Sequence, residues 1–92
     1  MGLLLLNCQH KTNIHLETFS TETGWGYVLK KNDHIFIKQE TIPAIPGNQT
    51  FSSEADARKV GILTMKKIKS GEGPSVTSAE LDSLKIVYHP FH

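Results

Sequence analysis

The feature that most limits what this chain can fold into is a proline-containing segment near its middle, residues 41–53, in which Pro43 and Pro46 stand three positions apart. Each proline fixes its φ angle near about −65° and lacks a backbone N–H donor, so neither a helix interior nor a central strand can pass through the segment. The residues before it have the pattern of strands, and those after it have the signals of helices. We therefore predict a shaped connection between a sheet and a helical layer.

Alternating apolar and polar side chains predict three strands before this segment, over residues 12–19, 25–30 and 35–40. Between the second and third strands, Asn32 and Asp33 tolerate positive φ and bond their own backbone, which predicts a hairpin turn. In the third strand, Phe36 and Lys38 are assigned to the outer face. The side chains assigned to the core are Trp25, Tyr27, Leu29, Ile35 and Ile37.

The residues after the segment carry the start and stop signals of two helices. Ser53 followed by Asp56 predicts the N-terminus of a helix over about residues 54–69, and Gly71 predicts a left-handed residue at its end. Thr77 and Glu80 form a second capping box, which opens a short helix. A glycine at position 61 indicates that the long helix lies close to the sheet. The inward face of that helix is predicted to hold Ala57, Val60, Gly61, Thr64, Met65 and Ile68.

Together these elements predict the fold class. Residues 85–88 have the composition of a last strand, which gives the order β-β-β-α-α-β. The prediction is an α+β domain, with an antiparallel sheet of three to four strands and one long and one short helix packed on one face. Ile42 and Ile45 are expected to cover one edge of the core, with residues 46–49 exposed as a rigid turn.

The first residues differ from the rest of the chain. Four leucines lead to Cys8, as in the second half of a bacterial lipoprotein signal, with Leu5 three residues before the cysteine. Residues 1–11 are therefore predicted to be a truncated lipoprotein-type signal and tether, or an N-terminal extension, and residues 12–92 a single domain. The alternative for the leucine run is a short buried strand, with Cys8 acting as a small apolar residue.

Composition excludes several classes of function. Ten basic and nine acidic residues give a net charge of +1, which provides no field for holding a nucleic-acid backbone. One cysteine allows no internal disulfide and no cysteine pair for zinc. No cofactor motif occurs, and the five histidines show no spacing that builds a metal site, so no cofactor, no metal and no catalytic residue is predicted.

Three phrases in order resemble a family of small bacterial domains of unknown function, whose members are often described as lipoproteins. They are Gly24-Trp25-Gly26-Tyr27, residues 42–49 leading into Phe51-Ser52-Ser53 and Ala57, and residues 74–77 with Glu80-Leu81. The resemblance implies a location in the bacterial cell envelope, with membrane attachment only through a lipid on Cys8. It implies no activity. The alternative location is the cytoplasm.

Two hypotheses for function follow. The first is a non-enzymatic interaction module that binds a protein partner, or a second copy of itself, through the open face of the sheet or the proline-containing loop. Its candidate residues are Phe19, Val28, Phe36, Lys38, Pro43, Pro46 and Asn48. The second hypothesis is a small enzyme or ligand binder that uses a polar cluster of His15, Glu17 and Lys38 on the same open face.

Overall fold

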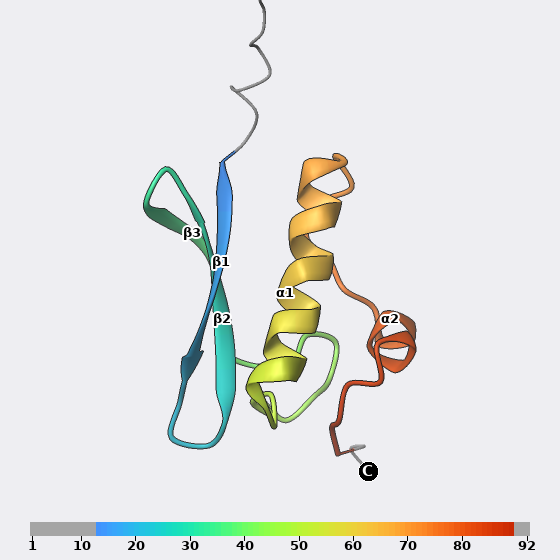
Figure 1. The fold of residues 1–92 in the computed structure, drawn as a ribbon. Helices are drawn as coiled ribbons and strands as arrows, with labels where there is room; N and C mark the ends of the chain where they lie inside the picture. Colours follow the sequence, from blue (N-terminus) through green and yellow to red (C-terminus); the bar gives the residue numbers. More distant parts are fainter. Residues whose placement is uncertain (1–12, 90–92) are drawn as a thin grey trace, which may run out of the picture.

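The computed structural model describes residues 13–89, which form a three-stranded antiparallel sheet followed by two helices (Figure 1). The predicted α+β class is confirmed. The prediction made for Cys8 concerns a position outside the described residues. The elements, in chain order, are β1 (Ile14–Ser20), β2 (Trp25–Lys31), β3 (His34–Gln39), α1 (Glu54–Lys69) and α2 (Ser78–Ser83).

Both helices lie on the same side of the sheet, which has the strand order β1-β2-β3. Helix α1 packs across β1 and β2, and α2 lies on the far side of α1 from the sheet (Figure 1). Two bonds hold α2 and its C-cap against α1: the Lys67 ammonium is 2.6 Å from a Glu80 carboxylate oxygen, and the Lys59 ammonium donates to the carbonyl of the C-cap residue Leu84 at 3.2 Å. None of the helices formed by residues 13–89 lies on the opposite face of the sheet.

The hairpin between β2 and β3 forms at the predicted turn but contains a bulge. Asn32 and Asp33 have φ angles of 53° and 69°. A two-residue turn in which both φ angles are positive matches the right-handed twist of the flanking strands. The register shifts between Leu29 and Lys30, so Leu29 pairs with Ile37 while Lys30 pairs with Ile35. Phe36 is the extra residue. The prediction that Ile35 points inward is therefore wrong, because the bulge puts Ile35 on the open face with Lys30.

The core lies between the sheet and α1. Tyr27, Leu29 and Val60 are buried, and the Tyr27 hydroxyl lies 3.0 Å from the Thr64 hydroxyl. Burial raises the pKa of the Tyr27 phenol, and the bond to Thr64 opposes part of that rise. A Cβ atom on Gly61 would lie 2.5 Å from Leu16 Cδ1, so the predicted close approach of helix to sheet is confirmed.

Two glycines flank Trp25 and allow close approach by other parts of the backbone. A Cβ atom on Gly24 would collide with the carbonyl oxygen of Phe51, and one on Gly26 would lie 2.7 Å from the carbonyl oxygen of Gln39. Phe51 forms a bridge with Trp25: the Trp25 N–H donates to the Phe51 carbonyl at 2.9 Å, and the reverse bond is 3.1 Å. Phe51 thus continues the sheet edge where β3 has ended.

The helix ends follow their sequence signals. Ser53 Oγ accepts from the Asp56 N–H at 3.1 Å, and Thr77 and Glu80 complete a capping box at α2. Gly71, with φ of 82°, ends α1 as predicted. The cap at Ser53 is not a full capping box, because the Asp56 side chain does not bond back to the Ser53 backbone. The buried Asp56 carboxylate instead accepts from the N–H of Val87 at 3.0 Å.

The predicted last strand at residues 85–88 is wrong. These residues form no strand, and Lys85 has a φ angle of 60°, which strands do not contain. The segment lies beside α1 and α2, away from both sheet edges (Figure 1). Its Ile86 side chain is buried in the core, and its Val87 N–H donates to the side-chain carboxylate of Asp56 rather than to a strand.

The proline-containing segment folds back on itself. The Ile42 N–H donates to the Gln49 carbonyl at 2.7 Å, which closes the loop. Ile42 is buried, and Ile45 packs partly buried against the core, so the prediction that they cover its edge is confirmed. Between them and Gln49, Pro46 and Asn48 are exposed, in agreement with the predicted turn.

Candidate functional site

The middle of the open sheet face is less exposed than the alternation predicts. Val28 is only 6% exposed, because Glu17 and Lys38 flank it in register on the neighbouring strands. The ammonium group of Lys38 lies 5.5 Å from the ring centre of Phe19, within the range of a cation–π contact. Of the predicted apolar residues on this face, Val28 is thus buried, Phe19 is half-buried and Phe36 is exposed.

The charged side chains of this face bond to partners other than those of the predicted polar cluster. Glu17 pairs with Lys30 at 3.2 Å, and Lys38 pairs with Glu40 at 3.3 Å. His15 is exposed opposite Lys30 in the strand register. The structure therefore does not join His15, Glu17 and Lys38 in one pocket, and each lies on an open surface.

Exposed apolar surface on β3 is concentrated at the bulge. Ile35 is 55% exposed and Phe36 is 43% exposed, and we call these two residues the β3 patch. β3 is an outer strand of the sheet, and no strand within residues 13–89 pairs with its outer edge, so its backbone groups there are available to a further strand. Residues 30–38 around the patch contain three lysines, of which Lys30 and Lys38 are ion-paired, so Lys31 is the lysine there that has no ion-pair partner among residues 13–89.

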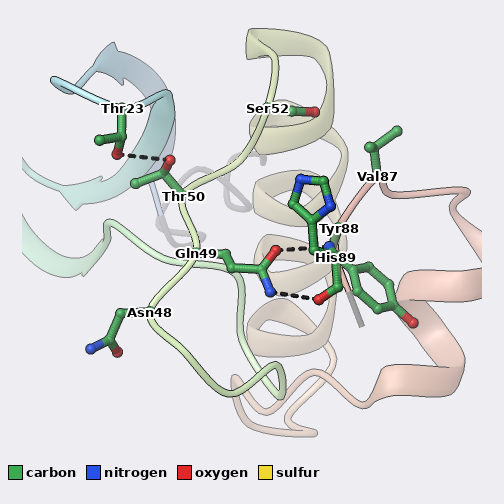
Figure 2. Close-up of a pocket in the computed structure, with 8 residues that line it drawn as sticks. All are labelled: Thr23, Asn48, Gln49, Thr50, Ser52, Val87, Tyr88 and His89. Carbon is green, nitrogen blue, oxygen red and sulfur yellow. Dashed lines mark hydrogen bonds between the residues drawn. The ribbon is translucent and has the colours of Figure 1, made fainter. Parts of the chain in front are cut away.

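A concave site lies where the proline-containing segment meets the C-terminal segment. Its volume is about 350 Å³, and we call it the C-terminal cleft (Figure 2). In Figure 2 the rings of Tyr88 and His89 point in opposite directions, as expected for neighbours in an extended segment. The residues that line the cleft are Thr23, Asn48, Gln49, Thr50, Ser52, Val87, Tyr88 and His89.

Side-chain hydrogen bonds hold the walls of this cleft together. The Gln49 amide pairs with the backbone of His89, donating to its carbonyl at 2.6 Å and accepting from its N–H at 2.8 Å. The hydroxyls of Thr23 and Thr50 are 3.0 Å apart and join the β1–β2 turn to the loop. The Tyr88 hydroxyl donates to Asp82 at 2.8 Å, and this bond to a carboxylate raises the pKa of Tyr88.

Sequence reasoning found one wall of the cleft and missed the others. Asn48, one of the predicted surface residues, lines the cleft. Pro46 is exposed and Pro43 is half-buried, and neither of these two prolines lines the cleft. Thr23 and His89 come from distant parts of the chain, and no local pattern marks them. The exposed Pro46–Asn48 turn was the only signal near the site.

Within residues 13–89, no three His, Cys, Asp or Glu side chains are grouped closely enough to hold a metal ion. None of the helices in this part of the chain is long and apolar enough to cross a membrane.

Comparison with known proteins identifies the family but no activity. No match to this chain was found among curated proteins or among solved structures. The family described as "Domain of unknown function (DUF4907)" matches residues 17–83, well over half of the chain, and this region includes the Gly24-Trp25-Gly26-Tyr27 phrase and both helices. The chain therefore belongs to the DUF4907 family of domains of unknown function.

Proposed function

We propose that this domain is a non-enzymatic interaction module of the bacterial cell envelope, which binds an acidic protein partner through the β3 patch. The observation that carries the proposal is the adjacent exposure of Ile35 and Phe36 at a bulge on an outer strand. Apolar side chains rimmed by charged ones are typical of protein-binding surfaces. A segment of the partner would pair with the free edge of β3, and the patch would give the contact its specificity.

The charge near the patch favours an acidic group on the partner. Lys31 has no ion-pair partner among residues 13–89, so an acidic group of a different protein is attracted to it, whereas a second copy brings only a further Lys31. Lys30 and Lys38 already have the carboxylate partners Glu17 and Glu40, which leaves Lys31 as the lysine best placed to meet a new acidic group.

Replacing Phe36 with glutamate is expected to weaken partner binding by about tenfold or more, because truncating or charging an anchor residue commonly costs over 1 kcal/mol of binding free energy. The partner would be recovered with the native protein from the envelope fraction and purified, and its Kd measured by calorimetry. The matched control is Ile62→Glu, which adds the same charge at an exposed isoleucine of α1. It is expected to leave Kd unchanged.

Salt and sedimentation complete the test. If the partner is acidic, raising the ionic strength weakens binding, since exposed charge attraction is screened. Sedimentation velocity of the purified domain is expected to show a monomer. Equal Kd values for Phe36→Glu and Ile62→Glu would overturn the proposal, as would a dimer that Phe36→Glu dissociates.

The envelope location rests on the resemblance to lipoprotein-like domains and on the leucine run that ends at Cys8. If Cys8 is the attachment point, mass spectrometry of the native protein from the membrane fraction is expected to find a diacylated Cys8 as the first residue. A Cys8→Ser variant is expected to lose this mass shift and leave the membrane fraction. A native protein that retains Met1 would contradict the lipid anchor and favour the cytoplasm.

A further inference from the structure

The C-terminal cleft carries an inference that is separate from the β3 patch. Its volume of about 350 Å³ is within the range of small-molecule sites, toward the lower end. Its lining contains no Asp, Glu, Lys or Arg. Carboxylate or phosphate ligands are usually bound by Arg or Lys, and hard cations by carboxylates, so this lining suits neither. The ligand it fits is uncharged.

The polar groups of the lining both donate and accept hydrogen bonds. The hydroxyl of Ser52 and the imidazole of His89 have no hydrogen-bond partner among residues 13–89, so both can bond to a bound molecule. Thr23 and Thr50 use one hydroxyl proton between them, which leaves one donor for a ligand. Val87 also lines the cleft and adds an apolar wall.

The walls are also fixed before any ligand arrives. Two hydrogen bonds between the Gln49 amide and the backbone of His89 hold the C-terminal segment against the loop. The bond from the Val87 N–H to the buried Asp56 carboxylate fixes the same segment to the start of α1. A site whose groups are held in place loses less entropy on binding.

From these observations we propose that the C-terminal cleft binds a short, uncharged saccharide. Sugar hydroxyls donate and accept in the same way as the Ser, Thr and His groups of the lining, and the C–H face of a sugar ring can pack on Val87. The volume suits a ligand of one or two sugar rings. The β1–β2 turn and the loop before α1, which line the cleft, lie at the opposite end of the sheet from the β2–β3 hairpin turn, so we expect the two binding activities to be independent (Figure 1).

The test is a titration of the full chain with maltose and with the β-1,4-linked dimer of N-acetylglucosamine, followed by ¹H–¹⁵N NMR. Saturable shifts are expected for the backbone amides of Thr50, Ser52 and His89 with at least one of the two sugars. Ser52→Ala is expected to raise Kd by about tenfold, the loss of one hydrogen bond. Ser75→Ala, a change at an exposed serine outside the cleft, is expected to leave Kd unchanged.

The absence of a saturable shift with either sugar would overturn the proposal, and so would equal Kd values for Ser52→Ala and Ser75→Ala. Each variant is exposed at the changed position, so its fold can be verified from the unchanged signals of the core. Phe36→Glu is expected to keep saccharide binding. Loss of sugar binding in Phe36→Glu would show that the shifts do not report on the cleft and would also overturn the proposal.

Discussion

Replacing Phe51 with alanine is expected to lower the free energy of unfolding by about 3–5 kcal/mol, because the cavity left by a fully buried phenylalanine is rarely refilled. Phe51 is 0% exposed, and its ring centre lies 6.1 Å from that of Tyr27. Its backbone also bonds to Trp25 on the sheet. A loss of this size is a large part of the total stability of a small domain.

Urea unfolding followed by tryptophan fluorescence would measure the change. Phe36→Ala is the matched control: the same side chain is removed at a site that is 43% exposed, and we expect a much smaller loss. Trp25→Ala is expected to lower the free energy of unfolding less than Phe51→Ala does, because Trp25 is only partly buried. This variant lacks the only tryptophan, so its unfolding would be followed by circular dichroism. If Phe51→Ala cost no more than Phe36→Ala, Phe51 would not be part of the core.

Replacing Ile86 with alanine is expected to cost about 2–5 kcal/mol, the usual range for a buried isoleucine. The structure predicts this loss because Ile86 is only 6% exposed and packs in the core cluster with Leu81 and Val60. The Ile86 N–H also bonds to the Leu81 carbonyl at 3.0 Å, which directs the side chain inward. The C-terminal segment is thus an integral part of the domain.

The neighbouring residue provides the control for this prediction. Val87 is 59% exposed, so Val87→Ala is expected to change the free energy of unfolding little. Denaturant midpoints of the two variants, measured under identical conditions, would compare them directly. Equal losses for Ile86→Ala and Val87→Ala would contradict the observed packing of the segment.

Much of the local structure could be predicted from the sequence. The bounds of α1, the Asn32-Asp33 turn and the capping box at Thr77 all agree with the structure. Each depends on residues within a few positions of one another, so short-range sterics and hydrogen bonding decide it. Gly61 shows that the same reasoning can reach tertiary packing when a small residue stands inside a helix.

The candidate sites were less predictable. The β3 patch contains Phe36, which alternation assigned to the outer face, and Ile35, which it assigned to the core. The difference is the bulge opposite Leu29 and Lys30. A bulge adds one residue to one strand and thereby reverses the faces of the residues beyond it. Nothing in the alternating pattern of β3 itself marks where that extra residue falls.

Sequence alone determined the fold class, the three strands, both helix starts and the role of the proline-containing segment as a connection whose isoleucines cover one edge of the core. Tertiary structure alone decided that Phe51 extends the sheet edge, that residues 85–88 pack beside the helices, and that Gln49 meets His89 to shape the C-terminal cleft. Gln49 and His89 are 40 positions apart. A contact across such a separation depends on how all the elements pack against one another, so the residues near either partner in the sequence do not determine it.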